Sequence, residues 1–275
     1  MKLANKVCLI AGGSGAIGSA IARRYAHEGA KLAITYLSAR PENVCEGIGE
    51  GVGRIACYRL NITDRERVQI VIEQIRADFG CIDVLVNCTG IQGPIGPLET
   101  LDMGDWARTI ETNLLGAVYL THAVLPLMKE RGRGKIILLS GGGATNGRPY
   151  FTSYSSSKAA VVRFAESLAQ ELEGANIQVN AIAPGPVRSR MWDEMRAAVQ
   201  VGGRRLREEL KSMDETGGAS PDRAAGLAVF LASDQSNRLT GRLFSALWDD
   251  WEHFEDNMER IVASDAFTLR RVPLK

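Results

Sequence analysis

The chain of 275 residues has only three histidines, His27, His122 and His253, and they lie far apart. A metal centre built from histidine and cysteine needs ligands at short spacing, but the five cysteines include no Cys-x-x-Cys pair. Scattered cysteines in odd number are typical of reduced thiols that serve mostly in packing. The sequence therefore predicts no bound metal and a thiol-reducing, cytoplasmic environment.

The sequence also lacks any apolar run near the ~20 residues that a membrane-spanning helix requires. Its first residues lead directly into a strand-like segment, which leaves no room for a signal peptide. The formal net charge of +1 provides no global field to attract nucleic acid or an anionic membrane. We therefore expect a small-molecule substrate and neither nucleic acid nor membrane as partner.

Short apolar runs alternate with helical segments along most of the chain. Strands are expected at 7–10, 31–36, 55–60, 84–87, 136–139 and 177–182, and helices at 16–27, 41–50, 64–79, 102–130, 154–173 and 221–232. This alternation is typical of a parallel sheet covered by helices on both faces. With right-handed crossovers it predicts a doubly wound, Rossmann-type α/β fold. Because no linker divides the chain, we expect a single domain over residues 1–248 and a tail at 249–275.

A glycine-rich stretch, Ala-Gly-Gly-Ser-Gly-Ala-Ile-Gly, joins the first strand to the first helix at residues 11–18. Glycines allow a tight turn and let the backbone approach a pyrophosphate, whose charge lies at the helix N-terminus. The competing interpretation is a β–α turn without ligand, but the strand before and the helix after favour a phosphate site. The candidate dinucleotide-binding residues of this loop are Gly12, Ser14, Gly15, Ala16, Ile17 and Gly18.

The end of the second strand bears on the choice of dinucleotide. An acidic residue there binds the ribose 2′-hydroxyl of NAD, whereas this chain has Tyr36. With no carboxylate to repel a 2′-phosphate, and with Ser38 and Arg40 close by to hold one, the sequence favours NADP(H) over NAD(H). The competing interpretation is that Arg40 only begins a solvated helix. Asn61 and Ile62, just after the third strand, are candidates to flank the adenine.

Tyr154 and Lys158 are spaced i, i+4 in a predicted helix, so their side chains share one face. A free phenol, with a pKa of about 10, is a poor acid–base catalyst at neutral pH. A neighbouring ammonium group favours the phenolate and brings the phenol toward the working range. Since Tyr-x-x-x-Lys is a short pattern, the competing interpretation is an ordinary amphipathic helix.

Taken in order along the chain, these motifs resemble those of the short-chain dehydrogenase/reductase family over residues 5–245. The family's Thr-Gly-x-x-x-Gly-x-Gly matches the glycine loop, with Ala11 in place of threonine and Ala16 in place of the middle glycine. Further matches are Asn87, Cys88, Thr89 and Gly90 after the fourth strand, Asn113, the pair Tyr154 and Lys158, and Pro184, Gly185, Val187 and Ser189 after the sixth strand.

The resemblance implies an NAD(P)(H)-dependent oxidoreductase that interconverts a secondary alcohol and a ketone by hydride transfer. In that family, Tyr154 would be the general acid or base, Lys158 would lower its pKa and bind the nicotinamide ribose, and Asn113 would hold a water. Val187 and Ser189 would fix the carboxamide. The resemblance also implies a homodimer or homotetramer.

The family's substrate-binding serine most often lies thirteen residues before the tyrosine, and that position is Gly141 here. Ser140 stands one residue earlier, and a loop longer by one residue would bring it to the catalytic place. We therefore predict Ser140 as a catalytic residue. The competing interpretation leaves Gly141 there and removes one donor to the substrate oxygen. Gly141 and Gly142 would then leave space for a bulky or polyhydroxylated substrate.

Arg188, Arg190 and Trp192 begin the segment that forms a substrate lid in this family, so we expect them at the substrate pocket. Two substrate classes compete, a 3-oxoacyl thioester and a sugar or cyclitol. The tail is expected to pack on its own or a neighbouring subunit. The alternative function is a dinucleotide-binding sensor or scaffold without turnover, which the departures at Ala16 and Gly141 motivate.

Overall fold

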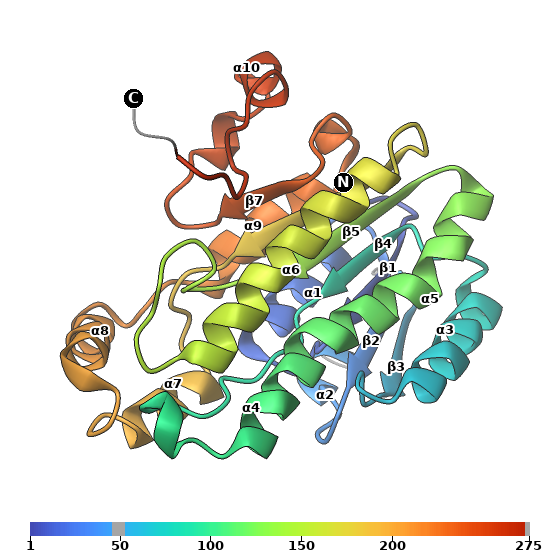
Figure 1. The fold of residues 1–275 in the computed structure, drawn as a ribbon. Helices are drawn as coiled ribbons and strands as arrows, with labels where there is room; N and C mark the ends of the chain where they lie inside the picture. The colour runs from blue at the N-terminus through green and yellow to red at the C-terminus, as the bar shows by residue number, and fades with distance from the viewer. Residues whose placement is uncertain (46–52, 273–275) are drawn as a thin grey trace.

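The structure, a computed structural model, describes residues 1–45 and 53–272 (Figure 1). Seven parallel strands form one sheet in the order β3-β2-β1-β4-β5-β6-β7. The strands are β1 (Val7–Ala11), β2 (Lys31–Tyr36), β3 (Ile55–Arg59), β4 (Val84–Asn87), β5 (Gly134–Leu139), β6 (Ile177–Ala183) and β7 (Arg242–Ser245). The order runs outward in both directions from β1 and β4, so the switch point lies between them. The prediction of a doubly wound α/β fold is confirmed.

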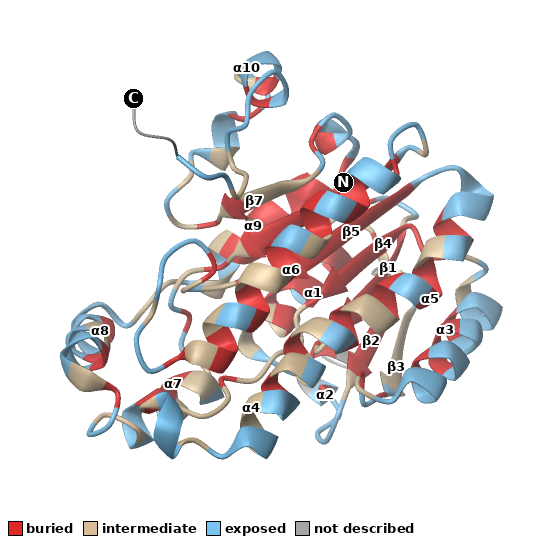
Figure 2. Ribbon diagram, in the orientation of Figure 1, coloured by how far each residue is buried: buried red, intermediate tan, exposed pale blue. Residues whose placement is uncertain are grey.

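Helices cover both faces of the sheet, and the inner strands are buried, whereas the edge strands β3 and β7 are mostly half-buried (Figures 1 and 2). The helices are α1 (Ala16–His27), α2 (Glu42–Cys45), α3 (Arg65–Phe79), α4 (Met103–Ile110), α5 (Gly116–Arg131), α6 (Thr152–Glu171), α7 (Arg190–Ala197), α8 (Gly203–Thr216), α9 (Pro221–Ala232) and α10 (Met258–Val262). Apolar side chains of α1 and α9 pack on one face, and those of α3, α5 and α6 on the other. The predicted helix at 41–50 continues beyond α2 into residues that lie outside the described ones.

Local sequence sets several helix boundaries. Asp64 precedes α3, and its carboxylate accepts a hydrogen bond from the backbone nitrogen of Arg67 at 2.9 Å. Gly80 ends the same helix at φ 83°, in the left-handed region that glycine enters without steric cost. Such caps satisfy backbone groups that the helix itself leaves open.

The tail contacts its own subunit through aromatic rings. Phe254 and Phe267 lie with their ring centroids 4.9 and 5.1 Å from that of Phe244 on β7. The carbonyl of Phe267 also accepts a hydrogen bond from the backbone nitrogen of Leu243 at 2.8 Å. This contact covers the outer edge of β7, which would otherwise be open to pairing with another strand.

Cysteine oxidation state departs from expectation at one position. Cys8, Cys81 and Cys88 are free thiols, but Cys57 is disulfide-bonded, so the prediction of reduced thiols is wrong there. Among residues 1–45 and 53–272, no helix has both the length and the apolar character to span a bilayer.

Candidate active site

The glycine loop turns between β1 and α1 at the carboxyl edge of the sheet. Gly12 has a φ of +79°, which favours glycine, and Gly15 stands at the cap of α1. A Cβ added at Gly18 would lie 2.3 Å from the carbonyl oxygen of Gly12. The absence of a side chain at Gly18 thus lets α1 close onto the turn, with its N-terminus facing the crevice where a phosphate would bind.

Gly18→Ala is therefore expected to displace the loop, because its methyl group would meet backbone rather than a flexible side chain. We expect the unfolding free energy to fall by ~1–3 kcal/mol and dinucleotide Kd to rise about tenfold or more. Thermal unfolding and calorimetric titration measure both. Gly147→Ala is the control, since its Cβ would meet nothing within 4 Å. An unchanged Kd in Gly18→Ala would contradict a phosphate site at this loop.

The residues after β4 lie against the glycine loop. Asn87 accepts hydrogen bonds at its Oδ1 from the backbone nitrogen of Thr89 at 3.1 Å and from the Thr89 hydroxyl. A Cβ at Gly12 would stand 3.0 Å from the Thr89 methyl group. Burial raises the pKa of the Cys88 thiol to about 12, so it stays protonated. Residues 87–90 and the glycine loop therefore form the two sides of the switch point.

Asn113 lies in a π-helical turn. The helix predicted over 102–130 runs without interruption from Met103 to Arg131, with Glu111–Leu115 forming a π-helical turn between α4 and α5. The Asn113 side chain accepts from the backbone nitrogen of Ile91 at 2.8 Å and donates to its carbonyl at 3.0 Å. It also donates to the Ser157 hydroxyl on α6 at 3.0 Å. Such turns occur often at functional sites.

Tyr154 and Lys158 are both buried on α6, with 9% and 3% of their surface exposed. The Lys158 ammonium lies 5.8 Å from the Tyr154 ring centroid and donates a hydrogen bond to the Leu139 carbonyl at 2.8 Å. A Cβ at Gly90 would stand 3.3 Å from the Lys158 nitrogen and 3.2 Å from the Asn113 Oδ1. The fold thus groups Gly90, Asn113, Tyr154 and Lys158 at one place.

Burial shifts both titrating groups of this pair. It lowers the pKa of Lys158 to about 8. It raises the pKa of Tyr154, and the positive charge of Arg148 acts in the opposite direction. Desolvation disfavours the charged form of each group. A cation near Tyr154 is therefore needed before the phenol can ionise near neutral pH.

Gly141 rather than Ser140 lies beside the Tyr154 hydroxyl, which favours the competing interpretation of this loop. The Ser140 hydroxyl is buried and donates to the Lys158 backbone carbonyl at 3.1 Å. A Cβ at Gly141 would stand only 2.5 Å from the Tyr154 hydroxyl. The backbone of Ser140 continues the pairing of β5 with β6, because its nitrogen donates a hydrogen bond to the Ile182 carbonyl at 2.8 Å. Because side chains alternate along a strand, residues 140 and 141 face opposite ways.

The residues predicted to select the dinucleotide lie at the end of β2 and just after it. Tyr36 is half-buried, while Ser38 and Arg40 are exposed. Arg59, which pairs with Tyr36 across β2 and β3, donates from its Nε to the Leu37 carbonyl at 3.2 Å. Arg59 is thus a second cation near the end of β2, and its place at the end of the third strand is the sequence signal that points to it.

The two residues after β3 face different surroundings. The Asn61 side-chain oxygen accepts from the backbone nitrogen of Thr63 at 3.2 Å, and Asn61 is exposed. Ile62 is 4% exposed and lies under the start of α5, where a Cβ at Gly116 would meet its Cδ1 at 2.4 Å. The Asn61 side chain is thus open to a ligand, whereas that of Ile62 is occupied in packing.

The segment after β6 leads into the helices α7 and α8. Gly185 adopts a φ of +84°, and Val187 forms a bridge with Ala219. Ser189 caps α7 in extended conformation. These residues lie at the same edge of the sheet as the glycine loop because all strands are parallel.

The lid residues predicted to face substrate are placed in different ways. Trp192 is only 3% exposed and packs with Phe151 and Tyr154. Arg188 stacks over the Trp192 ring at 5.5 Å. The exposed Arg190 pairs with Glu194 at 3.2 Å on the surface of α7. Of these three, Trp192 shares an apolar cluster with Tyr154 of α6.

A dinucleotide crevice and a buried tyrosine–lysine pair at its edge are the features of a dinucleotide-dependent oxidoreductase of Rossmann type. The family model for short chain dehydrogenase matches residues 6–200. The chain is 35% identical over 245 residues to the 3-oxoacyl-(acyl-carrier-protein) reductase of Thermotoga maritima, which covers 88% of this chain and 96% of that protein. It is 34% identical over 246 residues to the D-threitol dehydrogenase of Mycolicibacterium smegmatis, covering 87% and 90%.

A solved structure of NAD⁺-bound xylitol dehydrogenase superposes with a TM-score of 0.80 at 27% identity, over 89% of this chain and 98% of that one. The chain therefore belongs to the short-chain dehydrogenase/reductase family and is an NAD(P)-dependent oxidoreductase. The family membership and enzyme class predicted from the sequence are confirmed.

Proposed function

We propose that Tyr154 exchanges a proton with the substrate oxygen while the bound dinucleotide exchanges a hydride with the substrate carbon. The observation that best supports this proposal is the burial of Tyr154 and Lys158 beside Gly90 and Asn113 at the carboxyl edge of the sheet. Lys158 binds the nicotinamide ribose, and its charge favours the phenolate. Asn113 holds the loop at Ile91 and a water that connects Lys158 to solvent. Gly141 leaves the substrate oxygen without the hydroxyl donor that the family usually has.

The dinucleotide lies across the switch point, and each of its parts has candidate partners. The candidates for the pyrophosphate are Gly12, Ser14, Gly15, Ala16, Ile17 and Gly18. Those for the adenosine are Tyr36, Ser38, Arg40, Asn61, Asn87, Cys88, Thr89 and Gly90, with Ile62 through its backbone because its side chain is packed under α5. Those for the nicotinamide are Tyr154, Lys158, Pro184, Gly185, Val187 and Ser189. The cofactor supplies the hydride, and these residues orient it.

NADP(H) is the proposed cofactor. It is supported by the absence of an acidic residue at Tyr36 and by two exposed cations, Arg40 and Arg59, at the ends of β2 and β3. Arg40→Ala is expected to raise the KM for NADPH about tenfold and to leave the KM for NADH nearly unchanged. Initial rates with both nucleotides measure this. Equal effects on the two would remove Arg40 from 2′-phosphate binding.

A polyhydroxylated alcohol or ketone is the proposed substrate. The Trp192 indole nitrogen is buried without a hydrogen-bond partner, and Trp192 belongs to the same apolar cluster as Tyr154. Buried polar groups are normally paired, so this nitrogen is suited to a ligand that carries a hydroxyl. A Cβ added at Gly142, next to the Gly141 that faces the Tyr154 hydroxyl, would meet nothing within 4 Å, which leaves space for a bulky or polyhydroxylated molecule. The identity to a D-threitol dehydrogenase supports the same class.

A 3-oxoacyl thioester is the second candidate, because the reductase of Thermotoga maritima is similar over most of this chain. Measuring kcat/KM for a panel of polyols, cyclitols and 3-oxoacyl thioesters separates the two classes. A higher value for the thioesters would overturn the polyol assignment. If no compound reacts although the dinucleotide binds, the non-catalytic sensor is favoured instead.

Residues 1–248 are proposed as the catalytic domain and 249–275 as a tail that packs on it. We also propose a homodimer or homotetramer in the cytoplasm. The tail is supported by the rings of Phe244, Phe254 and Phe267.

A further inference from the structure

Arg148 lies on the loop between β5 and α6, and its charge is held inside the protein. Only 10% of its side chain is exposed. The guanidinium lies 3.7 Å from the Phe151 ring centroid, close enough for a cation–π contact. It also pairs with Glu209 of α8 at 2.5 Å and contacts the Met195 sulfur of α7 at 3.3 Å. A partly buried arginine held by three elements is a costly arrangement that calls for a reason.

The same two helices pack against the catalytic tyrosine. Tyr154 belongs to an apolar cluster that we call the lid core, formed by Phe151, Tyr154, Trp192, Met195, Leu206, Leu210 and Met213. These side chains come from α6, α7, α8 and the loop before α6. Movement of α7 and α8 would therefore change the surroundings of both Tyr154 and Arg148.

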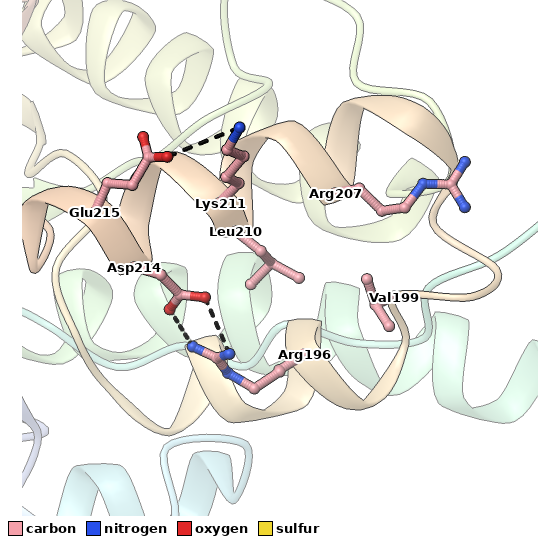
Figure 3. A pocket seen from close by; sticks show the side chains of 7 residues that line it. All are labelled: Arg196, Val199, Arg207, Leu210, Lys211, Asp214 and Glu215. Carbon is pink, nitrogen blue, oxygen red and sulfur yellow. Dashed lines mark hydrogen bonds and ion pairs between the residues drawn. The ribbon is translucent and has the colours of Figure 1, made fainter.

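Helices α7 and α8 are tied to each other on their outer side. An open pocket of about 520 Å³ lies between them. Figure 3 shows the ion pair of Arg196 with Asp214 among the side chains that line it. Lys211 and Glu215 pair along α8 at 3.8 Å. Because Arg196 is on α7 and Asp214 on α8, we treat the two helices as one lid. Through its ion pair with Arg148, Glu209 then connects that lid to the loop between β5 and α6.

We propose that Arg148 is a positioning residue for proton transfer at Tyr154, and that Glu209 of α8 holds it in place. This inference rests on the proposed role of Tyr154 as acid or base. The guanidinium favours the phenolate, in line with its lowering of the Tyr154 pKa against the effect of burial. The Glu209 carboxylate holds Arg148 in place and offsets part of its charge.

Other charged groups lie around the lid core, so a test must change only one of them at a time. They are Lys158 on α6, Arg188 stacked on Trp192, and Arg205 and Glu209 on α8. Arg205 offers a matched control, because it pairs with the same Glu209 at 3.3 Å but is exposed and donates to the Gly147 carbonyl at 3.0 Å.

The test is the pH profile of kcat/KM for alcohol oxidation, which rises with pH as the Tyr154 phenolate forms. Arg148→Met removes a cation, so the rise should move to higher pH, with a severalfold lower rate below the midpoint. Glu209→Gln keeps a hydrogen-bond acceptor but removes the negative charge, so the rise should move to lower pH. Arg148→Lys should restore the wild-type midpoint in part, and Arg205→Met should not move it.

Opposite shifts in Arg148→Met and Glu209→Gln support the proposal, because loosened packing would reduce the burial of Tyr154 in both variants and shift both midpoints the same way. It is overturned if both variants shift the profile in the same direction or leave it in place while thermal unfolding shows them folded. Should Arg148→Met fail to fold, Glu209→Gln and Arg148→Lys give the answer. If Tyr154→Phe keeps the wild-type profile, the proposed function itself fails; if only the shifts are absent, this inference alone fails.

Discussion

Tyr154→Phe is expected to lower kcat for alcohol oxidation and ketone reduction by about 10²–10⁴-fold, the usual contribution of a general acid or base. The change removes one oxygen from a side chain that is 9% exposed and packed by the lid core. The ring stays, so the fold and the dinucleotide crevice should be preserved. Steady-state rates with the best substrate of the panel measure the effect.

Two further measurements make this result specific. Dinucleotide Kd and thermal unfolding of Tyr154→Phe should match those of the wild type, since Phe keeps the packing with Phe151 and Trp192. A variant that binds the dinucleotide and turns over at the wild-type rate would show that the proton moves through another group. Loss of dinucleotide binding would instead indicate a structural role for the hydroxyl.

Gly141→Ala should lower kcat by about 10²-fold, because its methyl carbon would stand 2.5 Å from the Tyr154 hydroxyl. The phenol must then move, and a displacement of about 1 Å at a reacting group can cost that much in rate. The free energy of unfolding should change little, because the group that must move is the Tyr154 hydroxyl, at the far end of a side chain, and not the backbone.

Gly147→Ala, in the same loop and with nothing within 4 Å of its added Cβ, should keep the wild-type rate. Ser140→Ala gives a second comparison: its hydroxyl bonds to the Lys158 backbone rather than to the site. A larger fall in kcat for Ser140→Ala than for Gly141→Ala would reverse the assignment of these two positions.

Much of the fold was predictable because its signals are local. Apolar runs bounded by turns marked the first six strands within about two residues, a normal boundary error. The seventh, Arg242–Ser245, begins with a charged side chain and is short, so it lacks the apolar pattern of a buried parallel strand. It becomes a strand through pairing with β6 and cover by the tail.

The site was predictable where a motif fixes spacing, as for Tyr154 and Lys158 on one helix. The sequence did not decide between Ser140 and Gly141, since that choice depends on how far the pairing of β5 with β6 continues, which the contact with Ile182 determines. Arg148 carried no motif at all. Its contacts with Met195 and Glu209 join segments 47 and 61 residues apart, which sequence periodicity does not report.

A crystal structure with oxidised dinucleotide and a substrate analogue tests the central claim most directly. The account predicts the nicotinamide ring between the Tyr154 hydroxyl and the residues after β6, with the Lys158 ammonium moved from the Leu139 carbonyl to the ribose hydroxyls. The analogue's oxygen should lie within hydrogen-bond distance of the Tyr154 hydroxyl. A dinucleotide bound with its ring remote from Tyr154, while crystals remain competent for turnover, would contradict the account.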